Sequence, residues 1–325
     1  DTYVGVCSRS FSNNDALRSK LLRTYRNVRF NDEGLSLGGN ALVDFLRPCE
    51  KVIVGLEKID ERMLDRLPKL KVISKYGVGL DMLDLAALRQ RGIRLGWTAG
   101  TNCRAVSELV LAEMLNLLRN LPQLHLSTHQ GSWRRVIGDQ LSSKTVGILG
   151  CGHVGQDLVK LLTPFQCKII SHDKKPLTEF YTAFGVKSVS LDQLLVTADI
   201  VTIHVPLTSQ TKNMVKKEQL LCMKEDAIII NTARGGIINE QDLYEVMQSG
   251  HLSGAAIDVF DFEPYYGKLC EIKRCILTAH MGSMSVDCRT RMEIEATEEA
   301  VRFLTSQPLE GVVPEEEYAV QREGL

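Results

Sequence analysis

The chain has 325 residues, of which 44% are hydrophobic and 24% are charged, and its formal net charge at pH 7 is -1. This length exceeds the size at which a single hydrophobic core usually stops growing, so we expect two domains. The near-neutral charge gives no electrostatic reason to expect a nucleic-acid partner, and no apolar run is long enough for a membrane-spanning helix. The first residues, DTYVGVCSRSF, are typical of a strand rather than of a signal peptide, so we expect a cytoplasmic protein without a membrane partner.

Nine cysteines are scattered along the chain without a C-x-x-C pair. Their odd number and spacing favour free thiols in a reducing compartment. Cys270 and Cys275 are the closest pair, but no pair of histidines accompanies them, so we expect no metal site.

The first third of the chain contains short apolar runs rich in valine and isoleucine, at residues 3–7, 51–56, 71–77 and 93–97. Amphipathic segments separate these runs, a pattern that predicts βαβ units and a mostly parallel sheet. After Gly100, apolar residues recur at helical spacing over 103–121, which predicts a long helix connecting two domains. Pro122 interrupts the pattern, and residues 122–143 are polar without periodicity, so we expect a loop region there.

From Lys144 the alternation resumes, with six predicted strands at 144–150, 167–173, 199–205, 226–232, 254–260 and 275–280. Six such strands make one doubly wound sheet. Residues 285–304 then predict a charged helix, followed by a tail rich in proline and glutamate. Because the first domain lacks a closing helix, we expect this last helix to return to it.

A glycine motif, Gly150-x-Gly152-x-x-Gly155, directly follows the strand at 144–150 and begins a helix. In this context the first glycine makes the turn, the second lets a pyrophosphate approach the backbone, and the third packs helix on strand. Asp173 ends the next strand, where a carboxylate binds adenosine ribose hydroxyls and repels a 2′-phosphate. The motif predicts a Rossmann-like domain that binds NAD in preference to NADP, although Lys174 and Lys175 follow directly and weaken that preference.

Three polar residues follow successive predicted strands of the second domain: Arg234, Glu263 and His280. Parallel strands deliver such residues to one edge of a sheet. Oxidation of a 2-hydroxy acid needs a base, a partner that orients the base, and a cation for the carboxylate, which are roles that His280, Glu263 and Arg234 fill. Taken singly, the same residues also fit a structural histidine, a turn before Pro264 and a surface ion pair.

Six motifs give the chain a resemblance that spans nearly its whole length: KYGVGLDMLD, GILGCGHVG, HVPLTSQT, INTARGG, AIDVFDFEP and TAHMGS. With these motifs in this order, the chain resembles the D-isomer-specific 2-hydroxyacid dehydrogenases, a family that includes D-3-phosphoglycerate dehydrogenase. The resemblance implies that Arg234, Glu263 and His280 are the catalytic set. Glu263 argues against a formate dehydrogenase, which typically carries glutamine there.

The resemblance also implies contacts to the cofactor and the substrate. His204, Val205 and Pro206 would border the cofactor, Thr232 and Ala233 the nicotinamide ribose, and Asp258 the carboxamide. The remaining cofactor contacts implied in this way are His153, Val154, Thr211 and Gly282. The substrate would meet Arg234, His280 and the backbone amides of Val78 and Gly79. The chain departs from the family pattern at Ala99-Gly100, where Pro-Gly is usual, and at Cys151 and His153 in the glycine loop.

The domain plan that the resemblance implies is discontinuous, with residues 1–100 and 285–325 forming a substrate-binding domain and residues 101–284 the NAD-binding domain. The expected fold class is α/β, with two Rossmann-like doubly wound parallel-sheet domains and a cleft between them. The helix after Gly100 would be both a hinge and the contact of a homodimer.

We therefore predict an oxidoreductase that moves a hydride between NAD(H) and a D-2-hydroxy acid, with D-3-phosphoglycerate as the leading substrate. Lys75 and Arg104 are candidate phosphate ligands, and each also fits an ordinary surface charge. Glyoxylate, hydroxypyruvate and branched 2-keto acids are alternative substrates. The competing function is an NAD-sensing corepressor of the same fold, which binds peptides instead of turning over a substrate.

Overall fold

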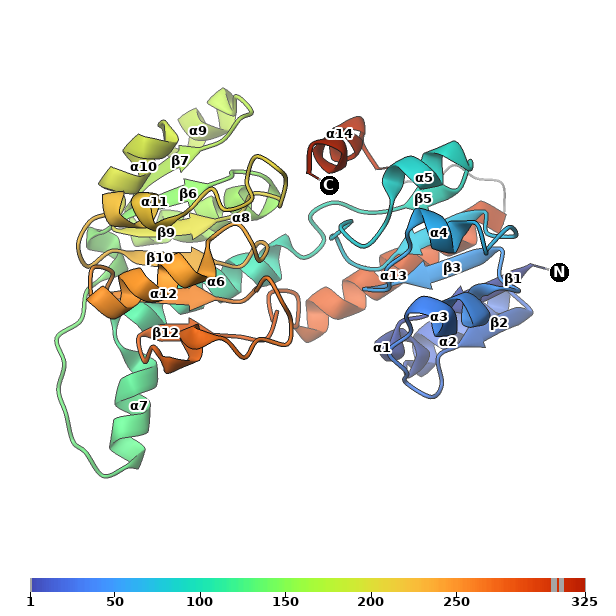
Figure 1. Ribbon diagram of the computed structural model, residues 1–325, viewed down its shortest axis with the longest axis horizontal. Coiled ribbons are helices and arrows are strands. Elements are labelled where there is room, and N and C mark those ends of the chain that lie inside the picture. Colours follow the sequence, from blue (N-terminus) through green and yellow to red (C-terminus); the bar gives the residue numbers. More distant parts are fainter. Residues whose placement is uncertain (1, 305–308, 310–312, 325) are drawn as a thin grey trace. The chain divides into compact units, whose positions relative to one another are not determined.

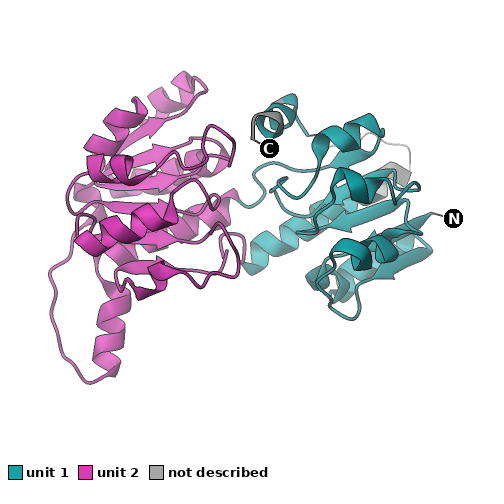
Figure 2. Cartoon of the chain, viewed as in Figure 1, with its two compact units in different colours: residues 1–102, 285–323 teal, residues 103–284, 324–325 magenta. Residues whose placement is uncertain are grey.

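The computed structural model describes residues 2–304, 309 and 313–324, so the tail predicted after residue 304 lies partly outside the described residues. The chain divides into two compact units, which Figure 2 colours separately. Unit 1 comprises residues 1–102 and 285–323, and unit 2 comprises residues 103–284 with 324–325. Each unit contains one parallel sheet flanked by helices (Figure 1).

Unit 1 is built on a five-stranded sheet in the order β2-β1-β3-β4-β5, in which every neighbouring pair is parallel. Its strands are β1 (Tyr3–Val6), β2 (Asn27–Phe30), β3 (Lys51–Val54), β4 (Val72–Lys75) and β5 (Arg94–Gly96). Its helices are α1 (Arg9–Ser12), α2 (Asp15–Thr24), α3 (Gly39–Leu46), α4 (Glu61–Leu64), α5 (Leu85–Gln90), α13 (Val286–Leu304) and α14 (Glu315–Gly324).

Helix α13 packs against β3, β4, β5 and α2 of unit 1, which confirms that the charged helix after residue 285 returns to the first part of the chain. The central strands β3 and β4 are buried over their whole length, as expected for strands that helices cover on both faces. The apolar runs at 51–56 and 71–77 were therefore reliable strand signals.

Unit 2 is built on a seven-stranded sheet in the order β12-β11-β10-β9-β6-β7-β8, again with parallel pairs throughout. Its strands are β6 (Thr145–Leu149), β7 (Lys168–His172), β8 (Lys187–Ser188), β9 (Ile200–Ile203), β10 (Ile228–Asn231), β11 (Gly254–Ile257) and β12 (Cys275–Leu277). The strand order reverses at β6, whose neighbours are β7 and β9. In open α/β sheets such a reversal marks the ligand-binding edge, and the glycine motif follows β6 directly.

The helices of unit 2 cover this sheet, and α6 packs against α8, β10 and β11. They are α6 (Cys103–Leu118), α7 (Leu121–His129), α8 (His153–Leu162), α9 (Thr178–Phe184), α10 (Leu191–Thr197), α11 (Lys217–Cys222) and α12 (Glu240–Ser249). Short 3-10 helices occupy η1 (Leu141–Ser143), η2 (Thr163–Phe165) and η3 (Lys268–Glu271).

Four elements differ from the sequence-based expectations. Strands β2 and β8 were not predicted, because each lies at a sheet edge and lacks an apolar run. The region 122–143 is a loop only in part, because Pro122 lies in the first turn of helix α7, where proline is tolerated, instead of starting a loop. Helix α14 lies in the segment predicted to be a tail. Within the described ranges, the structure has no helix that is long and apolar enough to cross a membrane.

Candidate active site

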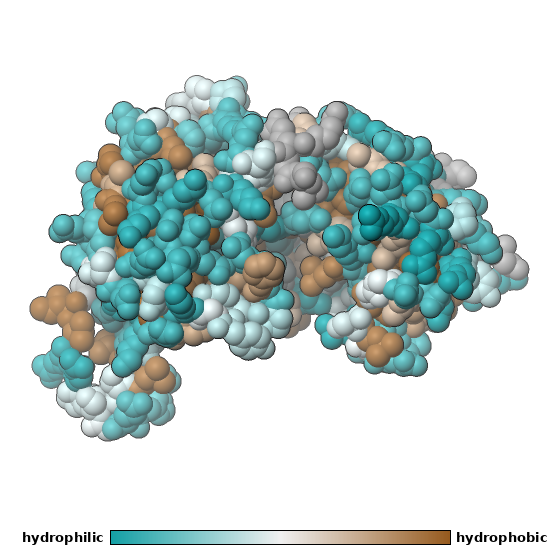
Figure 3. Space-filling view, in the orientation of Figure 1, coloured by the Kyte–Doolittle hydropathy of each residue, from teal (hydrophilic) through white to brown (hydrophobic). Residues whose placement is uncertain are grey.

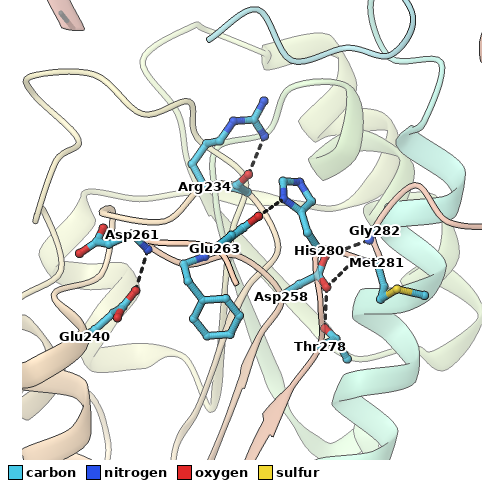
Figure 4. Close-up of polar contacts among 11 residues, drawn as sticks. Arg234, Glu240, Asp258, Asp261, Glu263, Thr278, His280, Met281 and Gly282 are labelled. Carbon is cyan, nitrogen blue, oxygen red and sulfur yellow. Dashed lines mark hydrogen bonds and ion pairs between the residues drawn. The ribbon is translucent and has the colours of Figure 1, made fainter. Parts of the chain in front are cut away.

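Three neighbouring strands of unit 2 bring Arg234, Glu263 and His280 to one edge of the sheet (Figure 4). The three residues follow the carboxyl ends of β10, β11 and β12, respectively. Figure 4 shows the His280 ring directed at the Glu263 carboxylate, with the Arg234 side chain on the same edge. The arrangement that the sequence predicted for these strand ends is therefore present in one unit.

The turn that carries Arg234 is shaped by Asn231, the last residue of β10. Its side-chain oxygen accepts a hydrogen bond from the Ala233 amide at 3.1 Å, and its side-chain nitrogen donates to the Arg234 carbonyl at 2.9 Å. An asparagine that bonds the backbone two residues ahead is a common turn former. Arg234 Nη1 donates to the Ala233 carbonyl at 2.7 Å, so one end of the guanidinium bonds to the turn itself.

Gly235 lets two site loops touch. A Cβ atom at Gly235 would lie 2.1 Å from the backbone of Phe260, and one at Gly236 would lie 2.9 Å from Asp261 Oδ1. Gly236 also has a φ of +75°, a conformation that side chains disfavour. In the structure the two glycines make room for the loop that holds Glu263.

Glu263 links its own loop to His280. Its Oε2 lies 3.0 Å from Nδ1 of His280, and its Oε1 accepts a hydrogen bond from the Phe260 amide at 3.1 Å. Both side chains remain partly exposed to solvent. A carboxylate at Nδ1 fixes the orientation of the ring and directs Nε2 outward, which is the geometry that general acid–base catalysis requires.

Asp258 holds the backbone that carries His280. Its Oδ1 accepts hydrogen bonds from the Thr278 hydroxyl and the Met281 amide, both at 2.6 Å, and its Oδ2 accepts one from the Gly282 amide at 2.9 Å. His280 itself has a φ of +53°, an unusual conformation for a residue with a side chain. Sequence reasoning predicted cofactor contacts for Asp258 and Gly282 and missed that the pair fixes the turn around His280.

The glycine loop has the geometry of a phosphate site. Gly150 has a φ of +91°, and a Cβ there would lie within 2.9 Å of His204 and Val205. A Cβ at Gly155 would lie 2.5 Å from the Gly150 carbonyl, whereas nothing lies within 4 Å of one at Gly152. The first and third glycines are therefore needed for packing, and the second faces open space.

Helix α8 begins at this open space, and its N-cap Gly152 offers no side-chain hydrogen bond. The first amides of the helix, at His153 and Val154, therefore face the position that an anionic group would occupy. The residues of the loop thus fit the pyrophosphate of a dinucleotide.

Asp173 stands at the end of β7 beside the glycine loop. Its Oδ2 accepts a hydrogen bond from the Cys151 amide at 2.6 Å, and its Oδ1 accepts one from the Lys175 amide at 2.8 Å. The carboxylate is thus fixed at the tip of the strand and is not a freely solvated loop charge. Its position is the one in which an aspartate binds ribose hydroxyls.

Two further predicted cofactor residues line the same sheet edge. Nε2 of His204 lies 2.9 Å from the Thr202 hydroxyl, and desolvation lowers the pKa of His204 to about 3, so the ring is neutral near pH 7. The Thr232 hydroxyl is buried and has no hydrogen-bond partner among the described residues. A buried hydroxyl without a partner is costly, and a ribose hydroxyl would satisfy it.

Thr211 closes the loop after β9 instead of facing open space. It is buried, its hydroxyl donates to the Pro206 carbonyl at 2.6 Å, and it accepts from the Thr208 amide at 2.7 Å. Thr211 thus supports the loop that contains Val205 and Pro206. The expected direct contact of Thr211 with the cofactor stays a prediction.

Val78 and Gly79 lie in unit 1, in the loop after β4, where the Val78 carbonyl accepts a hydrogen bond from Trp97 Nε1 at 2.9 Å. Lys75 is not an ordinary surface charge. Its side chain is buried, and Nζ donates to the carbonyls of Gly55 at 2.6 Å and Tyr76 at 2.8 Å. Arg104 lies in unit 2 and forms an ion pair with Asp157 at 2.9 Å.

Comparison with known proteins gives a consistent result. Residues 111–282 match the family model described as "D-isomer specific 2-hydroxyacid dehydrogenase, NAD binding domain". The chain is 32% identical over 304 residues to a D-3-phosphoglycerate dehydrogenase of Methanocaldococcus jannaschii, an alignment that covers 92% of this chain and 58% of that protein. It is 34% identical over 260 residues to a hydroxypyruvate reductase of Thermotoga maritima, covering 78% of this chain and 84% of the relative.

Among solved structures, the TT0316 protein of Thermus thermophilus is similar, with a TM-score of 0.85 and 31% identity, and the match covers 96% of this chain and 100% of the other. This match confirms the α/β fold with two Rossmann-like parallel sheets. The family model covers more than half of the chain, and the sequence relatives agree with it. The protein therefore belongs to the D-isomer specific 2-hydroxyacid dehydrogenase family, and residues 111–282 are its NAD-binding domain.

Proposed function

We propose that this protein is an NAD-dependent oxidoreductase that transfers a hydride between the nicotinamide and C2 of a D-2-hydroxy acid or the corresponding 2-keto acid. The observation that carries the proposal is the contact of His280 Nδ1 with Glu263 Oε2 at 3.0 Å, on the sheet edge that also carries the glycine loop. Family membership and the NAD-binding domain support it.

The roles of the residues follow from their chemistry. When bound, NADH would supply the hydride for reduction, and NAD⁺ would accept it in oxidation. His280 Nε2 gives a proton to the substrate oxygen during reduction and takes it back during oxidation, while Glu263 orients the ring and stabilises its charged form. Arg234 binds the substrate carboxylate with its planar guanidinium.

The cofactor and substrate contacts are assigned in the same way. Gly152, His153 and Val154 would hold the pyrophosphate, Asp173 the adenosine ribose, and Thr232 the nicotinamide ribose. In unit 1, the backbone amides of Val78 and Gly79 would bind the substrate carboxylate.

The substrate class is a small D-2-hydroxy acid together with its 2-keto acid. D-3-Phosphoglycerate is the first candidate, because one relative is named D-3-phosphoglycerate dehydrogenase. Hydroxypyruvate is the second, because another relative is named hydroxypyruvate reductase. Both proposed phosphate ligands already have partners, since Lys75 is buried against two carbonyls and Arg104 is paired with Asp157. For that reason an assay must include phosphorylated and unphosphorylated acids.

We further propose a cytoplasmic homodimer. All nine cysteines are free thiols, which suits a reducing compartment. The segment formed by α7 and residues 130–140, here called the arm, exposes large apolar side chains, and Figure 3 shows apolar surface on it. Exposed apolar surface of this kind is typical of a protein interface, so we propose the arm as the dimer contact in place of helix α6, which packs on α8, β10 and β11 of its own unit.

The test is a panel of 2-keto acids assayed by loss of NADH absorbance, with the wild type beside His280→Gln. We expect turnover of at least one acid by the wild type and a loss of roughly 10²–10⁴ in kcat for His280→Gln, with NADH affinity unchanged. NADH binding by a wild type that turns over no acid in the panel would favour the NAD-sensing corepressor.

A further inference from the structure

The loop from Asp258 to Tyr265 carries Glu263, and the first residue of helix α12 forms a hydrogen bond with this loop. Oε1 of Glu240, the first residue of α12, accepts a hydrogen bond from the Asp261 amide at 2.8 Å (Figure 4). This contact joins the helix to a point two residues before Glu263. No sequence motif pointed to it, because a glutamate in the first turn of a helix is common for reasons of helix stability alone.

The position of Glu240 is fixed by the chain around it. Asn239 caps α12 by accepting a hydrogen bond from the Asp242 amide at 3.0 Å, and Ile238 just before it is buried and bridges to Val215. Burial raises the pKa of Glu240, and the charge of Asp261 raises it further, while the hydrogen bond from the Asp261 amide lowers it. The carboxylate is therefore a partly desolvated acceptor on a rigid helix end.

The loop that Glu240 holds is packed on its other sides as well. Asp261 lies against the Arg234 turn, where a Cβ at Gly236 would come within 2.9 Å of its carboxylate. The Phe260 ring stacks on Tyr265 with a centroid distance of 4.2 Å, and the Phe260 amide donates to Glu263. The segment between Phe260 and Glu263 is thus packed against the Arg234 turn and Tyr265, and it forms a hydrogen bond with Glu240.

We infer that Glu240 is a positioning residue for the acid–base pair, because its hydrogen bond to Asp261 sets the loop conformation from which Glu263 reaches His280. Glu240 acts through the backbone and touches neither His280 nor Glu263 in the contacts of the described residues. The inference rests on the proposed function, in which Glu263 orients His280.

Three substitutions of Glu240 separate the effect of its side-chain length from the effect of its charge. Glu240→Gln keeps an acceptor oxygen at the same reach, Glu240→Asp keeps the charge at the helix start but shortens the side chain, and Glu240→Ala removes both. Glu245→Ala is the matched control, because Glu245 lies on the same helix and pairs with Lys217 at 2.9 Å.

If the hydrogen bond sets the loop conformation, Glu240→Gln should keep kcat within about threefold of the wild-type value. Glu240→Asp and Glu240→Ala should each lower kcat about tenfold, the equivalent of one lost hydrogen bond. NADH affinity should stay unchanged in all four variants. The pH profile of kcat in the Asp and Ala variants should move toward that of Glu263→Gln. A merely structural role would lower the folded fraction without moving that profile.

A second readout does not depend on turnover. Hydrogen exchange of the Asp261 amide, followed by NMR, should be faster in the Asp and Ala variants than in the Gln variant and the wild type. If the wild type turned over no 2-keto acid, this measurement would still report on the contact, so failure of the proposed function would be recognised separately. Equal kcat and equal exchange in Glu240→Ala and the wild type would overturn the inference, and so would an equal loss of kcat in Glu240→Gln and Glu240→Ala.

Discussion

Arg234 owes its position to the turn that follows β10. The Asn231 side chain closes that turn with two hydrogen bonds, and Gly235 lets the Phe260 backbone approach. The guanidinium therefore starts from a fixed backbone. A planar fork on such a base suits bidentate binding of a carboxylate, whereas an ammonium binds as a point charge.

Arg234→Lys is accordingly not a conservative change. We expect KM for the keto acid to rise and kcat to fall, with a combined loss in kcat/KM of roughly 10²-fold, because both carboxylate binding and its orientation are impaired. Steady-state kinetics across substrate concentrations separates the two effects. Kinetics equal to the wild type would show that Arg234 does not contact the substrate.

Among single residues, the sequence predicted those that combine a reactive side chain with a position directly after a predicted strand. Arg234, Glu263 and His280 were predicted in that way. The supporting residues Asp258 and Glu240 act on backbone amides of loops distant in the sequence. A single sequence contains no signal for such contacts, since any carboxylate can accept them once the loops have met.

Helix α6 lines one face of the unit 2 sheet with an apolar stripe that includes Val106, Val110 and Met114. Glu113 lies on the same helix, is 3% exposed, and has no hydrogen-bond partner for either carboxylate oxygen among the described residues. Burial raises the pKa of Glu113 to about 8, and the charge of Asp258 adds to the effect. Burial is the main cause that raises the pKa of Cys275, and the charge of Glu113 also raises it.

The raised pKa of Glu113 makes the stability of unit 2 depend on pH. Between the ordinary pKa of 4.5 and the folded value of about 8, the folded state binds more protons than the unfolded state. The free energy of unfolding therefore falls as the pH rises through this window, by at most about 1.4 kcal/mol per pH unit. Glu113→Gln should remove this slope.

Scanning calorimetry from pH 5 to pH 8 measures the effect as the change in midpoint temperature with pH. Glu108→Gln is the control, because Glu108 is exposed on the same helix and should leave the slope unchanged. The explanation would fail if Glu113→Gln kept the wild-type slope.

At the scale of elements, long apolar strands and periodic helices were predictable because burial on both sides imposes their composition. The edge strands β2 and β8 are partly or fully exposed and carry no such constraint. Helix α7 has no buried residue, so its sequence lacks the apolar stripe by which a helix is recognised.

The whole chain places its chemistry in loops at the carboxyl ends of parallel strands. In unit 2 the glycine loop and the three proposed catalytic residues follow strands of a single sheet. The glycine loop follows β6, where the strand order reverses. The order of motifs along the chain was sufficient to predict this assembly, because parallel βαβ units bring every second connection to the same edge.

Packing within one chain does not explain the exposed apolar side chains of the arm. Trp133 is 83% exposed, Ile137 is 99% exposed and Leu126 is 59% exposed, so the segment gains little from its own unit. Large apolar side chains that stay exposed in one chain are typical of a surface that a partner covers, and a second copy of the chain is the partner that we propose for the arm.

The double variant Trp133→Ser with Ile137→Asp should therefore convert a dimer into a monomer of 36.3 kDa, because it removes two apolar contacts and places a charge where water would be excluded. Sedimentation equilibrium over a range of concentrations measures the mass. Val196→Asp is the matched control, since Val196 is 52% exposed on α10, away from the arm, and this change should leave the dimer intact. A wild-type chain that sediments as a monomer, or a double variant that still dimerises, would show that the arm does not form the interface.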